Sequence, residues 1–234
     1  MSRPVRAPRL APPTALALAL LLVAAMPAEA VPRGSSLRQS ANVPFGCEGA
    51  LRPNPIFGYP EIVATGNRTC TLRGAGNIGG RISPSIVPGR GRITRFSVRV
   101  GRNPAPLRLT IATGSTTPPD PTAGTSGDFR CCTTRFFGPA FRPRANAVTT
   151  RLVNIPVDNQ QRGGGASFFD VVTISAMGPG SLPLHTTGNH FTFAFGSPLT
   201  YFYYPYMRLR EPRPEANGAD GFEVLLRWEW VRRR

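Results

Sequence analysis

The chain has 234 residues, among them 28 arginines and no lysine, and its formal net charge is +16. Glycine and proline are frequent, at 25 and 26 residues, but they follow no collagen period and fall between apolar segments, which argues against a fibrous or wholly disordered chain. The charge favours anionic partners, such as wall polymers, anionic lipid or nucleic acid. Because the arginines are scattered, a merely solvated surface is the competing explanation.

The N-terminus has the three parts of a cleavable signal peptide. Three arginines and no acid precede an apolar run at residues 15–26, and the small residues of Ala-Glu-Ala follow at 28–30. The run is shorter than the roughly 20 residues of a membrane span, and no later stretch is comparable. We therefore predict a signal peptide over residues 1–30 and a secreted or cell-surface chain without a transmembrane segment.

The first part of the predicted mature chain is polar, and residues 31–46 are expected to be a flexible leader. Weak strands are expected at 61–64 and 69–72. Residues 74–79 match the Gly-x-Gly-x-x-Gly pattern of dinucleotide sites, but prolines follow at 84 and 88 where that site needs a helix. We interpret the segment as a turn and expect no cofactor.

The four cysteines are Cys47, Cys70, Cys131 and Cys132. An even number in an oxidising compartment predicts two disulfides, for which three connectivities exist. We favour Cys47 with Cys70, which leaves Cys131 and Cys132 bonded as neighbours. In the alternatives each member of the adjacent pair bonds one N-terminal cysteine. The spacing and the presence of only two histidines argue against a metal site.

A clear alternation begins at residue 93. Phe96, Val98 and Val100 share one face of a half-buried strand, and a second alternating strand at 107–111 is expected to form a hairpin with it. Residues 113–128 are rich in Thr, Pro and Gly and are expected to be a long exposed loop.

The second half continues in the same style, with strands expected at 147–157, 168–176, 190–195, 201–207 and 222–231. In the last of these, one face carries Val224, Leu226, Trp228 and Trp230. Several short alternating strands separated by turns predict an all-β fold, a two-sheet antiparallel β-sandwich of jelly-roll type. We expect one domain over residues 47–231 and a basic tail at 232–234.

Candidate ligand-binding residues are taken from the densest aromatic run and the two arginines after it. Exposed rings stack on sugar faces, although packing in the core is the ordinary use of such a run. The predicted set is Tyr201, Tyr203, Tyr204, Tyr206, Arg208 and Arg210.

No catalytic residue is predicted. His185 and His190 lack any pattern that orients a catalytic triad. Asp170 and Glu223 lie within strands and would form a glycosidase pair only if they faced each other. Asp170 is expected to satisfy a backbone turn.

The Pro-Gly turn and strand at 87–100, the strand at 107–111, the Cys131-Cys132 pair, the strand at 149–157 and the ending at 225–230 resemble a family of secreted actinobacterial β-sandwich proteins. The family has no agreed activity. The resemblance therefore implies a fold and a compartment and adds no site residue.

Together these features predict an exported, non-enzymatic β-sandwich module that binds a polysaccharide or an anionic cell-surface polymer. No specific nucleic-acid recognition is expected. The alternative is a secreted hydrolase whose site is not readable from the sequence.

Overall fold

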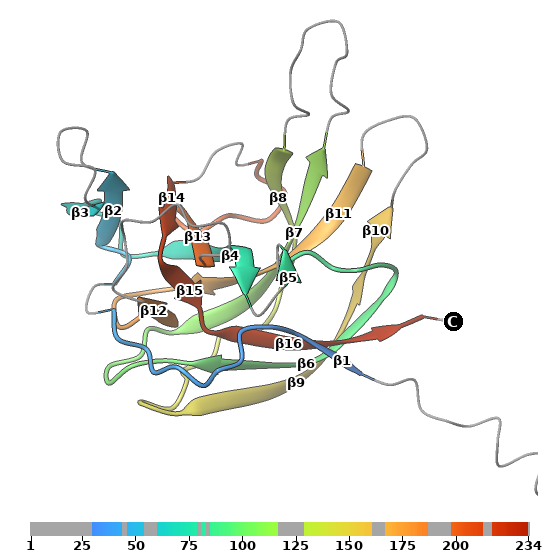
Figure 1. Cartoon of the computed structure of the whole chain (residues 1–234), viewed down its shortest axis with the longest axis horizontal. Coiled ribbons are helices and arrows are strands. Elements are labelled where there is room, and N and C mark those ends of the chain that lie inside the picture. Colours follow the sequence, from blue (N-terminus) through green and yellow to red (C-terminus); the bar gives the residue numbers. More distant parts are fainter. Residues whose placement is uncertain are drawn as a thin grey trace, which may run out of the picture.

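The computed structural model describes residues 30–43, 46–53, 60–78, 81–82, 85–116, 129–160, 167–186, 198–212 and 217–233. Every regular element in these ranges is a β-strand, and every pairing between named strands is antiparallel (Figure 1). The all-β, antiparallel prediction is confirmed for this part of the chain.

Two sheets make up most of the fold. The four-stranded sheet has the order β1 (Val31–Gly34), β16 (Leu226–Arg232), β6 (Gly91–Arg99) and β9 (Val148–Val157). The eight-stranded sheet has the order β14 (Asn217–Asp220), β13 (Pro198–Tyr203), β4 (Cys70–Ile78), β11 (Ser167–Ala176), β7 (Leu107–Thr116) and β8 (Phe129–Phe137), with β5 (Arg81–Ile82) on β4 and β10 (Asn159–Gln160) on β11.

Two small sheets complete the described part. They are the pair β2 (Gly49–Pro53) with β3 (Pro60–Ala64) and the pair β12 (Leu184–Thr186) with β15 (Phe222–Val224).

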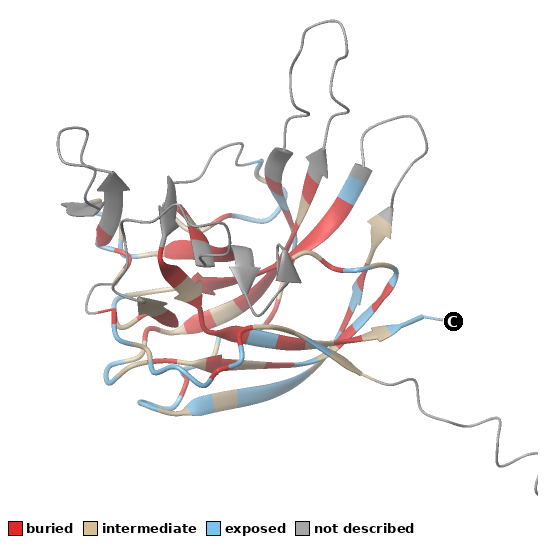
Figure 2. Ribbon diagram, in the orientation of Figure 1, coloured by how far each residue is buried: buried red, intermediate tan, exposed pale blue. Residues whose placement is uncertain are grey.

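Side chains from both large sheets form one apolar cluster. The alternation predicted from the sequence holds in β6, where Phe96 and Val98 are buried, and in β16, where Trp228 and Trp230 are buried. Residues of β4, β7 and β11 meet them from the other sheet. Figure 2 shows buried residues along β16, β6 and β11, whereas β9 is exposed along most of its length. As the last strand of its sheet, β9 leaves one edge unpaired.

The chain joins the two sheets at the end of β9. β9 pairs with β6 in the four-stranded sheet, and β10 begins two residues later and pairs with β11 in the eight-stranded sheet. A strand that bends from one sheet into the next makes a corner, and side chains from both sheets meet there.

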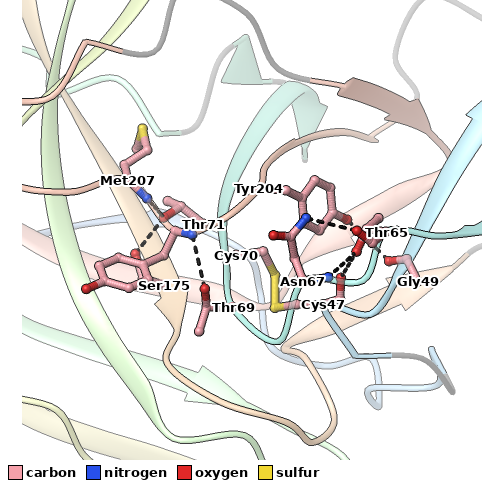
Figure 3. Close-up of a disulfide and its surroundings, with 11 residues drawn as sticks. Cys47, Gly49, Thr65, Asn67, Thr69, Cys70, Thr71, Ser175, Tyr204 and Met207 are labelled. Carbon is pink, nitrogen blue, oxygen red and sulfur yellow. Dashed lines mark hydrogen bonds between the residues drawn. A yellow bond between two sulfur atoms is a disulfide. The ribbon is translucent and has the colours of Figure 1, made fainter.

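The disulfide between Cys47 and Cys70 is present, as predicted, and both cysteines are buried (Figure 3). Hydrogen bonds surround it: Thr65 Oγ1 donates to the Cys47 carbonyl at 2.7 Å, and the Asn67 N–H donates to Thr65 Oγ1 at 3.1 Å. Cys132 is also disulfide-bonded. The side chain of Cys131 lies outside the described part, so its pairing with Cys132 stays a prediction.

The segment predicted as a flexible leader, residues 31–46, contains a strand. Val31 pairs with Trp230 and Gly34 with Arg227, and Leu37 and Val43 are buried. The sequence did not predict this pairing because an edge strand buries few of its side chains and therefore need not show an apolar pattern. The leader prediction is therefore wrong for residues 31–34.

Other element boundaries also change. The segment at 74–78, interpreted as a turn, lies in β4, and the first residues of the loop predicted at 113–128 belong to β7. β8 was not expected. Arg232, assigned to a basic tail, is the last residue of β16 and pairs with Gly91. Residues 1–29 of the signal peptide predicted at 1–30, the loop residues 117–128 and the strand predicted at 190–195 lie outside the described residues.

Candidate functional site

A pocket of about 440 Å³ opens at the corner between β9 and β10. Strands β6, β7, β8, β9 and β11 contribute to its wall, and so does the segment that follows β16. We call it the arginine pocket, and its charged lining residues are Arg90, Arg92, Arg135, Asp158, Asp170 and Arg233. Four guanidinium groups against two carboxylates leave a surplus of positive charge on one concave surface.

Asp170 links several strands that form the wall of the pocket. Its side chain is only 5% exposed, and its carboxylate accepts a hydrogen bond from four donors. Arg135 Nε donates to Oδ1 at 3.0 Å and Arg135 Nη2 donates to Oδ2. Thr113 Oγ1 donates to Oδ1 at 3.2 Å, and the backbone N–H of Asp158 donates to Oδ2 at 2.6 Å. A buried carboxylate requires such partners, since an uncompensated buried charge is strongly unfavourable.

Arg135 is fixed by these contacts and still reaches the pocket. Its Nη2 also donates to the Pro156 carbonyl of β9 at 2.8 Å, so it bridges the edge strands of the two large sheets. The side chain is 39% exposed. The described residues supply an acceptor for Nε and Nη2 but none for Nη1. A guanidinium held at one edge offers its remaining N–H groups to a ligand with little loss of side-chain entropy.

The other three arginines lie around this fixed group. Arg92 Nη1 donates to Asn154 Oδ1 at 2.9 Å, which orients it along the β6–β9 pair. Arg90 and Arg233 are exposed, and the Arg233 N–H donates to the Arg90 carbonyl at 3.2 Å, so their backbones are adjacent. Phe168, 44% exposed, adds an apolar surface to the same pocket. Four arginines that line one concave surface suit a phosphate or carboxylate group.

The aromatic run lies on β13 and just beyond it, and both faces of this strand are covered. Phe202 belongs to the main core cluster, and Tyr203, 3% exposed, belongs to a second cluster with Cys132 and Met207. Phe202 and Tyr203 point to opposite faces of β13, and each face is covered by its own cluster of buried side chains. Stacking on a sugar needs an exposed ring, and the Tyr203 ring is not available for it.

The three remaining predicted tyrosines are only partly accessible, whereas the two arginines are exposed. Tyr201 is half-buried beneath the Arg73 guanidinium, 4.4 Å from its ring centre. Tyr204 stacks on Phe202 and its hydroxyl donates to the Gly49 carbonyl at 3.3 Å. Tyr206, also half-buried, lies beside Phe137. Arg208 and Arg210 are exposed. The two arginines do not line the arginine pocket, and a ligand role for this region stays a prediction.

Burial raises the pKa of Tyr204, and it raises the pKa of Tyr203 although the charge of Arg73 opposes the rise. Below the ordinary value of 10.0 both rings are neutral whether the chain is folded or unfolded, and their stabilising contribution is complete. Above it the unfolded chain ionises first, so we expect the free energy of unfolding to fall as the pH rises beyond 10. Urea unfolding on either side of this pH measures the loss, which the Tyr203→Phe/Tyr204→Phe double variant should reduce. An equal alkaline loss in that variant would contradict the expectation.

The residues weighed for hydrolysis are not assembled. Asp170 lies on β11 with its carboxylate engaged by four donors, whereas Glu223 lies on β15, opposite His185 in the β12–β15 pair. His185 Nδ1 lies 2.8 Å from the Ser40 carbonyl oxygen. Glu223 and His185 do not line the arginine pocket, and His190 lies outside the described residues.

The sequence reasoning missed the arginine pocket. One signal was present: Asp170 is the one charged residue of a strand that reads as buried, and a buried carboxylate predicts a cationic partner. The Asp170 carboxylate accepts a hydrogen bond from the backbone N–H of Asp158, as expected. Nothing in the sequence indicated which arginine would bind it.

No protein-family model, no curated protein sequence and no solved structure matches this chain. The part of the chain that the structure describes holds no helix with the length and apolar character needed to cross a membrane.

Proposed function

We propose that the chain is an exported, non-enzymatic binding module with a β-sandwich fold of jelly-roll type, and that it recognises the anionic groups of a cell-surface polymer. The observation that carries the proposal is the guanidinium of Arg135, fixed by Asp170 within a pocket that three further arginines line. Arginine pairs with phosphate and carboxylate oxygens through parallel N–H groups, so a fixed guanidinium recognises geometry as well as charge.

Export is supported by the N-terminal pattern of arginines, apolar run and Ala-Glu-Ala site. The disulfide between Cys47 and Cys70 fits an oxidising compartment. β1 begins at Val31, directly after the predicted cut, so cleavage there leaves the first strand whole.

The alternative, a secreted hydrolase, has less support. Every acceptor position of the Asp170 carboxylate is used by a donor that fixes the corner of the fold, and Glu223 lies elsewhere. Binding at the pocket requires no such free carboxylate.

The test is binding of the full chain, purified from a host that exports it, to poly(glycerol phosphate), polygalacturonate and neutral dextran at low and high salt. The N-terminus of the purified protein, read by mass spectrometry, tests the cut after Ala30. We expect retention on an anionic polymer and none on dextran. The Arg90→Gln/Arg233→Gln variant should bind about tenfold more weakly, a loss of roughly 1.4 kcal/mol.

The matched control is Arg208→Gln/Arg210→Gln, which removes the same charge from the site predicted from the sequence. It should bind as the unaltered chain does. If this control loses binding and the pocket variant does not, the site lies beside the aromatic run. Retention on neither anionic polymer at low salt would overturn the proposal.

A further inference from the structure

A second concave surface near the arginine pocket is lined mostly by apolar residues, with Arg151 and Asn154 as its polar members. It has a volume of about 410 Å³, and we call it the apolar groove. Its main apolar lining residues are Phe96, Leu109, Phe136, Pro139, Phe141 and Leu152. Ligand sites have volumes of roughly 300–1,000 Å³ and mostly apolar walls.

The wall of the apolar groove is preformed. The segment after β8 is tied to β7 by reciprocal backbone hydrogen bonds of 2.8 Å between Leu107 and Phe141, and by the Gly138 N–H donating to the Leu109 carbonyl at 2.9 Å. Phe141 packs edge-on against Phe96 with ring centres 5.5 Å apart. On β9, Arg151 pairs with Phe96 and its guanidinium lies 5.4 Å from the Phe141 ring centre, and the next residue, Leu152, also lines the groove and is 77% exposed.

The groove and the arginine pocket are parts of one surface along the edge strands β8 and β9. On β9, residues 151–155 line the groove and residues 156–158 line the pocket. Arg92 of the pocket donates to Asn154 of the groove at 2.9 Å. The walls of the two volumes are therefore neighbours along β9.

A register shift in β8 explains how two neighbouring residues, Arg135 and Phe136, line the arginine pocket and the apolar groove respectively. Ile111 pairs with Phe136 and Ala112 with Thr134, so Arg135 is an extra residue without a counterpart on β7. Successive strand residues normally point to opposite faces, but a bulge re-aims one of them. Arg135 thus bonds Asp170 in the pocket while Phe136, the next residue, lines the groove.

We infer that this surface binds an amphiphile: an acyl chain in the apolar groove joined to a phosphate-bearing headgroup in the arginine pocket. The inference rests on the proposed function and adds the lipid portion of the ligand. In the site an apolar surface lies next to a positively charged one. In such a molecule an apolar chain is joined to a negatively charged group, so each part of the ligand has a matching part of the site. A phosphate suits a pocket lined by four arginines better than a carboxylate does, because it offers more oxygen acceptors.

The test is calorimetric binding of decyl phosphate, ethyl phosphate and decyl glucoside to the full chain, below the concentration at which micelles form. We expect decyl phosphate to bind at least tenfold more tightly than ethyl phosphate, since only the longer chain reaches the groove. Decyl glucoside, with the same chain and a neutral headgroup, should bind more weakly than decyl phosphate.

Leu152→Asn probes the groove without disturbing the core, because that side chain is already exposed. It should reduce the advantage of decyl over ethyl phosphate. The matched control, Val148→Asn, changes another exposed apolar residue of β9 that does not line the groove, and should leave the advantage unchanged.

Equal affinity for decyl and ethyl phosphate would overturn the inference and leave the proposed anion site standing. Binding of neither phosphate at low salt would overturn both. Equal binding of decyl glucoside and decyl phosphate would show that the headgroup charge is not read, which also overturns the inference.

Discussion

Replacing Asp170 by asparagine is expected to lower the free energy of unfolding by about 3 kcal/mol, towards the lower end of what removing one partner of a buried ion pair costs. The lower end applies because Arg135 is 39% exposed and water can partly solvate it. The amide is nearly the same size as the carboxylate, so the loss reports charge and hydrogen bonding rather than volume.

The geometry explains why asparagine is a poor substitute. Each oxygen of Asp170 accepts from two donors: Oδ1 from Arg135 Nε and Thr113 Oγ1, and Oδ2 from Arg135 Nη2 and the Asp158 N–H. In either orientation the amide nitrogen faces an N–H group of Arg135 and leaves it without that acceptor. Buried donors without partners cost about 1–3 kcal/mol. The freed guanidinium also loses its fixed position, so binding of phosphate at the arginine pocket should weaken with it.

Urea unfolding of the Asp170→Asn variant measures the stability, and a cycle with Arg135→Met isolates the pair, since the double variant should lose less than the sum of the single losses. Glu229→Gln is the matched control. It removes a carboxylate from the ion pair with Arg95, whose two atoms lie 3.4 Å apart near the surface, and should cost no more than about 1 kcal/mol. If Asp170→Asn and Glu229→Gln lowered the free energy of unfolding equally, the buried ion pair would contribute no more to stability than the pair near the surface.

The second large effect concerns the disulfide. The Cys47→Ala/Cys70→Ala variant should lose about 3 kcal/mol, because the bond closes a loop with a sequence separation of 23 and its removal gives the unfolded chain more conformational freedom. Both cysteines lie in the core cluster, so lost packing adds to that figure. Denaturant unfolding of the variant measures the loss. A variant is preferable to a reducing agent because Cys132 is disulfide-bonded as well.

Thr65→Val separates the covalent bond from the hydrogen bonds around it (Figure 3). This change removes the Thr65 hydroxyl contacts with the Cys47 carbonyl and the Asn67 N–H and keeps the disulfide. It should cost about 1 kcal/mol. If it destabilised the protein as much as the loss of both cysteines, the polar contacts rather than the bond would hold this region together.

The sequence by itself determined the features that a strand encodes locally. Alternation of apolar and polar residues identified β6 and β16 and the faces that they bury, including Trp228 and Trp230. It also gave the all-β, antiparallel class and favoured the bond between Cys47 and Cys70, which lies within one short loop. These predictions succeeded because side chains two apart on a strand share a face, whatever the strand pairs with.

Only the tertiary structure decided which strands lie side by side and which residues meet as a result. β1 pairs with a strand from the other end of the chain, Tyr203 of β13 is buried against Cys132 and Met207, and an extra residue in β8 turns Arg135 towards Asp170. Alternation says which face of a strand is buried but not which strand lies beside it or where the register slips. The candidate site depends on those choices, since its charged residues come from both large sheets and from the segments before β6 and after β16, and they meet only at one corner of the fold.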